Sequence, residues 1–329
     1  MTHKIAFLVE GGLEMGMGHI YRSITLADEI RDKGEICFLT KSDEIVVNQL
    51  QKSGFSAIKA KTDDEIARRL EEIHPTVVII DRLEVEELFA KGLKDKLNTR
   101  LVIFGNLSSA NKYADVVVNA GVGSSFQNKG FIDKNTNTLY FYGPRYLILR
   151  REFYKFKEKA QKPNGEVRRV LLLFGGSDPL NLTSKVLDEL LSWQKELKTD
   201  IILGSGFTYI GELNMVLEKH QSKKGSVKIY QNIKNVAQLM YKADLVITSP
   251  GISMFEALCT GTPVIAISQT AFHRNLFDRF FRTLHEDGII KLKDMISAND
   301  FLNPDTKYIK NLDIGGGKAE IINAIVGRR

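Results

Sequence analysis

The chain has 329 residues, of which 43% are hydrophobic and 26% are charged, a composition typical of a globular protein long enough for two domains. Its net charge of +6 is modest, and its Lys and Arg residues are spread without a recognisable nucleic-acid-binding module, so we expect no nucleic-acid partner. No apolar run reaches the roughly 18 residues of a transmembrane helix, and the first apolar run begins too early for a signal peptide, so we expect a cytoplasmic protein without a transmembrane segment.

The first half of the chain alternates apolar strands with helical segments. We expect strands over residues 5–9, 36–39, 55–58, 76–80, 101–104 and 116–118, and helices over 20–31, 43–52, 63–73 and 85–97. Strands that alternate with helices of about a dozen residues form right-handed βαβ units and a parallel, doubly wound sheet. Residues 119–138 are rich in Gly, Ser and Asn, and we expect irregular structure there.

The same alternation restarts after a polar segment. Strands are expected over residues 170–174, 201–203, 227–230, 245–248 and 264–267, and a last helix over 318–325. We therefore predict a Rossmann-like domain over 1–156, a linker over 157–168 and a second Rossmann-like domain over 169–329, whose last helix could pack back on the first domain. Two such α/β domains with a ligand cleft between them are the GT-B fold.

A glycine-rich loop with a histidine opens the first helix. The loop supplies Gly16, Gly18, His19 and Arg22. Glycines let a backbone approach a ligand closely, a helix N-terminus offers free N–H groups, and an imidazole can move a proton near neutral pH. A glycine-rich turn with a capping histidine fits the same residues. A dehydrogenase is disfavoured, because the position of the third glycine in a dinucleotide-binding turn is occupied by Tyr21.

The second half carries a more specific pattern at the end of the strand over 245–248. Ser249-Pro250-Gly251 leads at once into a helix with Ser253 and Glu256 in its first turns. The N–H groups and hydroxyls there can hold a diphosphate, and Glu256 can accept hydrogen bonds from both hydroxyls of a ribose. A carboxylate that only complements the helix dipole is the alternative for Glu256.

Several blocks together carry a family resemblance. Residues 249–263 resemble the nucleotide site of GT-B UDP-sugar enzymes. Residues 16–27, the block Tyr142-Gly143-Pro144 to Phe153, and Gly175-Gly176-Ser177-Asp178-Pro179 to Thr183 resemble the UDP-sugar hydrolases of pseudaminic acid biosynthesis and their relatives among spore-coat polysaccharide biosynthesis proteins. The resemblance covers nearly the full length of the chain.

The resemblance implies hydrolysis of UDP-2,4-diacetamido-2,4,6-trideoxy-β-L-altrose to the free sugar and UDP. Water attacks the anomeric carbon with inversion, and His19 acts as the general base. The substrate-binding residues implied or indicated by the motifs are Gly16, Gly18, Arg22, Asp81, Tyr146, Gly175, Gly176, Ser177, Ser249, Gly251, Ser253, Glu256, Gln269 and His273.

After the last predicted strand, Gln269, or His273 together with Arg274, could reach the sugar or a phosphate. A solvated helix start is the alternative interpretation of these residues. We expect no cofactor and no metal, because helix-start amides and hydroxyls can stabilise the departing diphosphate. Asp63-Asp64 is interpreted as helix capping, and Cys37 and Cys259 as reduced thiols without metal-ligand spacing.

The chain departs from the family pattern on the side expected to face the sugar. Glu10 replaces an aspartate, Asp81-Arg82-Leu83 replaces Asp-Ser-Tyr, and Gly105-Asn106 replaces a pair of aspartates. The residues expected to hold UDP are kept, whereas those expected to face the sugar differ from the family pattern, so the identity of the sugar is left open. Two other functions fit the same residues: a glycosyltransferase that moves a UDP-activated sugar to an acceptor, and a sugar-nucleotide-binding protein without catalysis.

Overall fold

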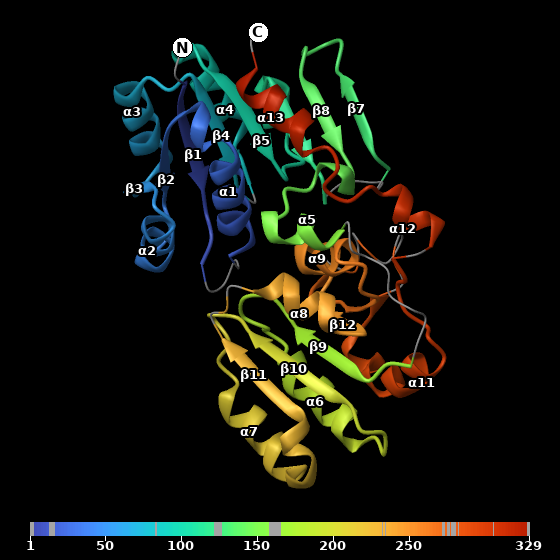
Figure 1. Ribbon diagram of the computed structural model, residues 1–329. Helices are drawn as coiled ribbons and strands as arrows, with labels where there is room; N and C mark the ends of the chain where they lie inside the picture. The colour runs from blue at the N-terminus through green and yellow to red at the C-terminus, as the bar shows by residue number, and fades with distance from the viewer. Residues whose placement is uncertain are drawn as a thin grey trace. The chain divides into compact units, whose positions relative to one another are not determined.

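The structure is a computed structural model that describes residues 3–12, 17–82, 84–121, 127–157, 166–231, 233, 235–271, 274, 277, 281, 283–304 and 306–327. The chain forms two compact α/β units, each with its own sheet (Figure 1). The first unit comprises Met1–Leu149 and Leu312–Arg329, and the second comprises Arg150–Asn311.

The first unit is built on a sheet with the strand order β3-β2-β1-β4-β5-β6-β8-β7. Neighbouring strands are parallel except for β7, which pairs antiparallel with β8 at the edge. The central strands are continuous apolar runs with both faces buried, as expected for a parallel sheet covered by helices. The strands are β1 (His3–Val9), β2 (Gly34–Thr40), β3 (Ser56–Lys59), β4 (Val77–Asp81), β5 (Arg100–Phe104), β6 (Val116–Asn119), β7 (Lys129–Ile132) and β8 (Leu139–Tyr142).

Helices cover this sheet and form its hydrophobic core. Buried residues such as Leu8, Ile80 and Ile103 on the sheet pack with Leu70 of α3 and Leu93 of α4. The helices of the first unit are α1 (Gly18–Glu29), α2 (Glu44–Lys52), α3 (Asp63–Ile73), α4 (Glu87–Lys96) and α13 (Lys318–Val326), with short 3₁₀ turns η1 (Arg31–Lys33), η2 (Ser109–Tyr113) and η3 (Pro144–Tyr146).

The second unit has a fully parallel sheet in the order β11-β10-β9-β12-β13-β14. Its strands are β9 (Arg169–Leu173), β10 (Lys198–Leu203), β11 (Val227–Gln231), β12 (Leu245–Thr248), β13 (Val264–Ile267) and β14 (Thr283–Leu284). The described helices are α5 (Arg151–Lys157), α6 (Leu182–Ser192), α7 (Ile210–Lys219), α8 (Val236–Lys242), α9 (Ile252–Cys259), α11 (Leu292–Ser297) and α12 (Lys307–Asn311), with 3₁₀ turns η4 (Gln221–Ser226) and η5 (Glu286–Lys291).

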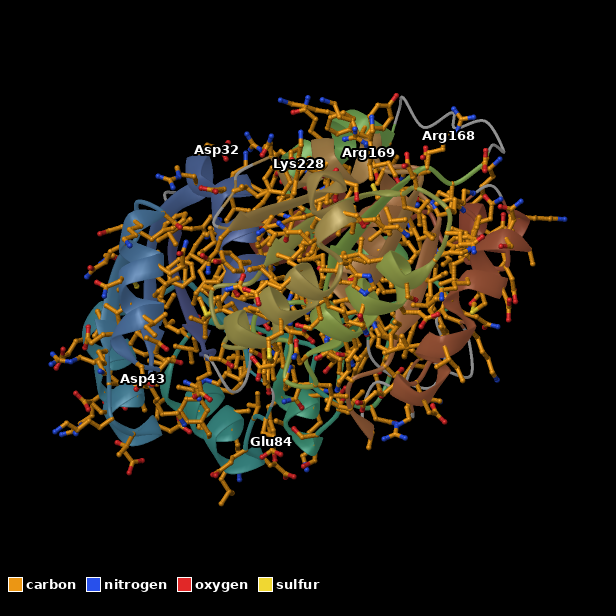
Figure 2. All side chains as sticks on the ribbon, turned by 90° about the horizontal axis from the view of Figure 1, so that it is seen from below. Asp32, Asp43, Glu84, Arg168, Arg169 and Lys228 are labelled. Carbon is orange, nitrogen blue, oxygen red and sulfur yellow. The ribbon has the colours of Figure 1, made fainter. Side chains whose placement is uncertain are left out.

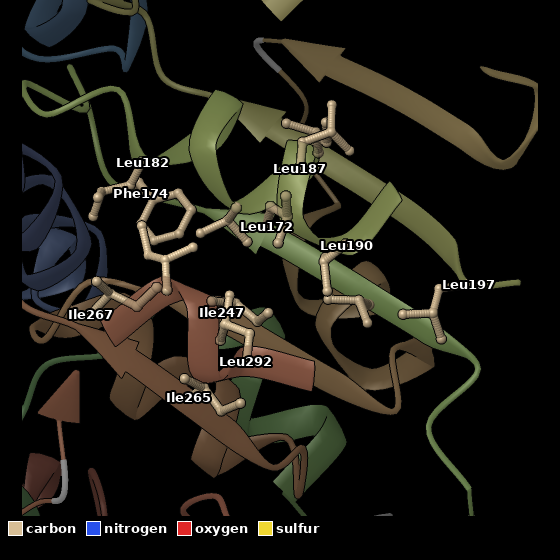
Figure 3. Close-up of a cluster of buried hydrophobic side chains, with 14 of the residues drawn as sticks. Leu172, Phe174, Leu182, Leu187, Leu190, Leu197, Ile247, Ile265, Ile267 and Leu292 are labelled. Carbon is tan, nitrogen blue, oxygen red and sulfur yellow. The ribbon is translucent and has the colours of Figure 1, made fainter. Parts of the chain in front are cut away.

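The core of the second unit lies between this sheet and helices α6 and α11. Leu172 and Ile247 of the sheet pack with Leu187 and Leu190 of α6 and with Leu292 of α11 (Figure 3). Exposed charges of both signs lie on the outside of each unit, for example Asp43 and Glu84 in the first and Lys228 in the second (Figure 2). Within the described residues, no helix combines the length and the hydropathy needed to span a bilayer.

Most of the predicted strands and helices agree with the structure, with several differences in detail. Residues 119–138 were expected to be irregular, but they contain the edge strand β7, and strands β8 and β14 were not expected either. The first helix of the second half was expected to run through Lys198, but α6 ends at Ser192 and β10 begins at Lys198. The units divide at 149/150 and 311/312, whereas the predicted domain ends are 156 and 168, so α5 belongs to the second unit. Residues 158–165 of the predicted linker lie outside the described residues.

The C-terminal segment, defined here as residues 312–327, packs on the first unit. The guanidinium of Arg100 donates hydrogen bonds to the carbonyl oxygens of Ala324 at 3.0 Å and Gly327 at 2.7 Å. Lys318 forms an ion pair at 3.0 Å with Glu29 of α1. The last helix is therefore a structural part of the unit that contains β1.

Candidate functional site

The first candidate site lies at the carboxyl edge of the first sheet. The strand order reverses at β1, which pairs with β2 on one side and with β4 on the other. In open α/β sheets, ligands bind outside the carboxyl ends of the strands at such a switch point. Asp81 is the last residue of β4 and is buried. Gly18 and His19 are the first two residues of α1, which follows β1.

His19 and Asp81 form a direct contact at this edge. Nδ1 of His19 lies 2.6 Å from Oδ1 of Asp81. A carboxylate oxygen can only accept a hydrogen bond, so Nδ1 carries a hydrogen, and in the neutral form of the ring Nε2 has the lone pair. Nη2 of Arg22 lies 3.2 Å from the same nitrogen, and we interpret it as a neighbour around the shared oxygen. The sequence placed all three residues in the site, and the structure brings them together.

Two residues besides His19, Arg22 and Ser23, hold the Asp81 carboxylate through three hydrogen bonds. Nε of Arg22 donates to Oδ2 at 2.8 Å, Nη2 of Arg22 donates to Oδ1, and the Ser23 hydroxyl donates to Oδ2 at 3.0 Å. Burial alone would raise the pKa of the Asp81 carboxyl, but Arg22 and His19 outweigh it and hold this pKa well below its usual range. Asp81 is therefore a fixed negative charge. Ser23 was not predicted, although its place one helical turn from His19 is a usable signal.

Gly105 makes room for the guanidinium of Arg22. This residue follows β5 with a φ of +64°, a conformation that favours glycine. A Cβ atom at this position would lie 3.2 Å from Nη2 of Arg22. The replacement of an aspartate by Gly105, one of the departures from the family pattern, therefore leaves space for Arg22 beside Asp81.

Two other departures meet in a second group of charges, which we call the Arg82 cluster: Glu10, Lys41, Asp63 and Arg82. Arg82 is 2% exposed and lies 2.7 Å from Asp63 and 3.3 Å from Glu10, while Lys41 lies 3.1 and 3.2 Å from the same two carboxylates. Burial would raise the pKa of Asp63, but Arg82 and Lys41 lower it below its usual range. The charges of Glu10 and Arg82 are thus balanced within the cluster.

Asp63 and Asp64 lie in the first turn of α3, as interpreted from the sequence, but Asp63 also has partners outside the helix. The side-chain cap of α3 is the hydroxyl of Thr62, which accepts a hydrogen bond from the backbone N–H of Glu65 at 3.2 Å. The carboxylate of Asp63 accepts from Nη1 of Arg82 and from Nζ of Lys41. An acidic residue at a helix start fits either role, and the sequence pattern does not reveal a partner on another strand.

Tyr146 is engaged in contacts that hold the C-terminal segment. Its hydroxyl donates to Glu320 at 3.2 Å, and its ring packs against Phe141. A Cβ atom at Gly317 would lie 2.5 Å from the Tyr146 ring. These contacts give Tyr146 a structural task in the first unit, and its role in substrate binding stays a prediction.

In the second unit, the glycine loop after β9 is held by a hydrogen bond from the loop after β10. Gly175 has a φ of +77°, and the N–H of Gly206 donates to the carbonyl oxygen of Gly176 at 2.8 Å. A Cβ atom at Gly204 would lie 2.2 Å from that oxygen, so only glycine allows this close approach. The loop with Gly175, Gly176 and Ser177 is therefore fixed by residues 204–206, which sequence reasoning did not single out.

Asp178 precedes α6 in the chain, and its carboxylate lies at the start of this helix. Its carboxylate accepts hydrogen bonds from the N–H groups of Leu182 and Thr183, each at 2.8 Å. Burial raises the pKa of Asp178, and these hydrogen bonds partly oppose the shift. A carboxylate already satisfies the first turn of α6, so a diphosphate in the second unit would rely on the glycine loop and on α9.

The loop before α9 provides the other predicted phosphate groups. Gly251 precedes α9 with a φ of +145° and has open space on its Cβ side. The amide of Gln269 donates to the hydroxyl oxygen of Ser249 and, at 3.1 Å, to the carbonyl oxygen of Phe174. Gln269 therefore joins the ends of β9, β12 and β13 and leaves the Ser249 hydroxyl free to donate. Ser253 lies half-buried in the first turn of α9.

Gln269 also lines a pocket of about 740 Å³ between α6, η5 and the end of β13. Lys185, Ser268, Arg274 and His285 are further members of its lining. Gln269 and Arg274 thus line the same pocket, and their contact with a sugar or a phosphate stays a prediction. Gly16 and His273 lie outside the described residues, and their assignments stay predictions.

Glu256 is buried in α9 and paired with a cation. Nε and Nη2 of Arg150 lie 3.3 and 3.2 Å from its Oε1. The pKa of Glu256 is raised to about 6, mainly by burial and in smaller part by the neighbouring Glu152, against the effect of Arg150. From the sequence, Glu256 was interpreted as a carboxylate that binds the ribose or as one that complements the helix dipole. The sequence pattern did not indicate its partner Arg150.

The sequence was compared with those of known proteins. No protein-family model matches the chain. An uncharacterized protein of Methanocaldococcus jannaschii, MJ1062, is 45% identical over 98% of the chain, which spans 66% of that protein's length. The spore coat polysaccharide biosynthesis protein SpsG of Bacillus subtilis is 27% identical over 80% of this chain and 77% of its own. The UDP-2,4-diacetamido-2,4,6-trideoxy-β-L-altropyranose hydrolase of Campylobacter jejuni is 23% identical over 78% of this chain and 88% of its own.

Solved structures settle the fold class. MurG of Acinetobacter baumannii superposes with a TM-score of 0.61 at 10% identity, covering 98% of this chain and 99% of its own. The fold is GT-B. Anabaena HepE, solved in complex with UDP and glucose, gives a TM-score of 0.54 at 15% identity, covering 98% of this chain and 95% of its own.

Proposed function

We propose that this GT-B protein hydrolyses a UDP-linked deoxy-amino sugar, of the UDP-2,4-diacetamido-2,4,6-trideoxy-β-L-altrose type, to the free sugar and UDP. The observation that carries the proposal is the 2.6 Å contact between Nδ1 of His19 and Asp81. It fixes the ring orientation and leaves Nε2 as a base. A capping histidine needs no buried carboxylate behind it, and Asp81 is held by Arg22 and Ser23 as well.

The proposed reaction is a single displacement. Nε2 of His19 accepts a proton from water while the water oxygen bonds to the anomeric carbon from the side opposite the leaving group. The bond between that carbon and the diphosphate oxygen breaks, and UDP leaves with the electron pair. Asp81 stabilises the imidazolium that forms, because its own low pKa keeps it ionised throughout. The sugar is released with inverted anomeric configuration.

In this proposal the second unit binds the nucleotide. N–H groups of the Gly175-Gly176-Ser177 loop and of the start of α9, with the hydroxyls of Ser249 and Ser253, hold the diphosphate and stabilise its growing charge. Glu256 accepts hydrogen bonds from the ribose. The nucleotide identity is supported by the UDP-sugar hydrolase of Campylobacter jejuni and by Anabaena HepE with UDP.

A glycosyltransferase is the second candidate, because an acceptor hydroxyl can take the place of water beside Nε2 of His19. Its support is the fold shared with MurG and with a glycosyltransferase of Rickettsia africae, which superposes with a TM-score of 0.59 at 13% identity and covers 100% of both chains. The two candidates differ in one observable: a hydrolase releases UDP from the sugar nucleotide with water alone.

The test is a screen of UDP-sugars, with and without acceptor glycans, that follows UDP release. In ¹⁸O-labelled water, a hydrolase of the proposed type places the label on the anomeric hydroxyl of the free sugar, and NMR of the first product shows the inverted anomer. UDP release that requires an acceptor would replace hydrolysis with transfer. UDP binding without turnover of any donor would contradict both enzymatic functions.

A further inference from the structure

Arg150 is held in place on three sides at the start of the second unit. It immediately precedes α5, which packs against α8 and α9. Its Nε and Nη2 both approach Oε1 of Glu256, its Nη1 lies 3.2 Å from Oε1 of Glu152, and its guanidinium lies 4.8 Å from the ring centroid of Phe153. An arginine fixed in this way presents its charge to one carboxylate oxygen in a defined orientation.

Glu256 depends on this arginine for its charge. Its side chain is 7% exposed, and burial disfavours a carboxylate without a cation nearby. Helix α9 packs against α5, α8, β12 and β13. Among the described residues of these elements and the residue before α5, two charged groups act on Glu256. Arg150 favours the ionised carboxylate, and Glu152 opposes it. Both hydrogen bonds from Arg150 go to Oε1, so neither uses Oε2.

We propose that Arg150 is the positioning residue of the nucleotide site: it keeps Glu256 ionised and oriented, with Oε2 left to accept the ribose hydroxyls, and Glu152 weakens this effect. The inference rests on the proposed binding of UDP by the second unit. It adds that the affinity for UDP follows the charge of Glu256, because an ionised carboxylate accepts two hydroxyls better than a carboxylic acid does.

Arg150 and Glu152 therefore have opposite effects, which an experiment can separate. UDP affinity of the full chain is measured by calorimetry between pH 5 and 8 for the wild type and for Arg150→Gln, Arg150→Lys and Glu152→Gln, with Arg151→Gln at the next, exposed position as the matched control. Wild-type affinity should rise with pH through about 6, the pKa of Glu256. Arg150→Gln should weaken binding at pH 7 about tenfold, the scale of a lost charge-assisted hydrogen bond, and should move the rise to higher pH.

The other variants complete the pattern. Arg150→Lys, which keeps the positive charge, should retain most of the affinity, and Glu152→Gln should move the rise to lower pH. Carbon NMR of the Glu256 carboxyl, assigned by its loss in Glu256→Gln, gives the same order of titration midpoints without nucleotide. If Arg150→Gln fails to fold, the Lys and Glu152→Gln variants still test the proposal.

Two results separate this inference from the proposed function. If the wild type binds UDP and Arg150→Gln changes neither the affinity nor the Glu256 titration, the positioning role is overturned while UDP binding stands. If the wild type binds no UDP, the proposed function fails together with the nucleotide role of Arg150, even where the NMR midpoints shift as expected.

Discussion

Nδ1 of His19 lies 2.6 Å from Oδ1 of Asp81, although the two residues are 62 positions apart in the chain. The contact joins the start of α1 to the end of β4 at the point where the strand order of the first sheet reverses. In the neutral imidazole it assigns the hydrogen to Nδ1 and the lone pair to Nε2. The proposed chemistry depends on this assignment. The predictions below begin with His19 and Asp81.

Replacement of His19 by Ala should lower kcat about 10²- to 10⁴-fold, the usual effect of removing a general base. UDP binding should be nearly unchanged, because the proposed nucleotide groups belong to the second unit. The wild-type kcat/KM should show an acid limb, because a protonated imidazole cannot act as a base, and this limb should be absent in His19→Ala. Steady-state kinetics over pH and calorimetry with UDP provide the measurements.

His74→Asn is the control for that experiment. His74 is an exposed histidine that ends α3 with a φ of 51°, a conformation that Asn tolerates. It should leave kcat and the pH profile unchanged. If His19→Ala keeps its turnover per folded molecule and loses only about 1 kcal/mol of stability, His19 is a helix-start residue and not the base.

Asp81→Asn should lower both kcat and stability. An amide side chain can donate to the imidazole, which favours the wrong tautomer, and it leaves the half-buried Arg22 without its carboxylate. The loss in free energy of unfolding at pH 7 should be about 3–5 kcal/mol, the range for breaking a buried ion pair. Denaturant unfolding and steady-state kinetics on the same preparations measure the two effects.

The stability difference between wild type and Asp81→Asn should depend on pH in one direction. Because the folded pKa of Asp81 is lowered, its stabilising effect is fully present above the unfolded value of about 3.9 and is lost as the pH falls further. The difference should be constant between pH 7 and 5 and should shrink below about pH 4. A difference that already disappears near pH 6 would show that another group titrates in its place.

Glu256→Ala should weaken UDP binding by about 1–3 kcal/mol, the scale of lost hydrogen bonds to a charged group. Calorimetry at pH 7.5, above the pKa of about 6, compares the ionised wild type with the variant. Glu212→Ala on the exposed side of α7 is the matched control and should bind UDP as the wild type does. Unchanged affinity in Glu256→Ala would move the ribose site elsewhere.

Gly317→Ala should destabilise the first unit by about 1–3 kcal/mol, because its Cβ would lie 2.5 Å from the Tyr146 ring and overpacking has costs of this size. Gly92→Ala, inside α4 with nothing within 4 Å of its Cβ, should instead stabilise by about 0.5–1 kcal/mol. Unfolding curves give both values, and limited proteolysis shows whether residues 312–327 become accessible in the first variant. Equal effects of both substitutions would contradict the packing of Gly317 on Tyr146.

Much of the fold could be predicted from the sequence, because apolar runs such as those over 76–80 and 170–174 indicate buried parallel strands. It missed β7, since the residues from Lys129 to Ile132 contain a glycine and a lysine and no apolar run. Edge strands need less apolar character than central ones, so hydrophobic periodicity detects them poorly.

The groups of the candidate site were also recognisable from the sequence, but their partners were not. Local pattern places His19 at a helix start and Asp81 at a strand end. It does not state that Arg150 meets Glu256, 106 residues away, or that Tyr146 meets Glu320, 174 residues away. Such pairs depend on how distant segments pack, and no motif of a single chain encodes them.

The chain leaves the first unit after Leu149 and returns to it at Leu312. On the ribosome, residues 150–311 are therefore complete before the segment that carries Glu320 and the carbonyl partners of Arg100 has been made. The second unit can fold while the first still lacks its last helix. A nascent chain that stops short of residue 312 would carry a complete second unit beside a first unit that lacks its C-terminal segment.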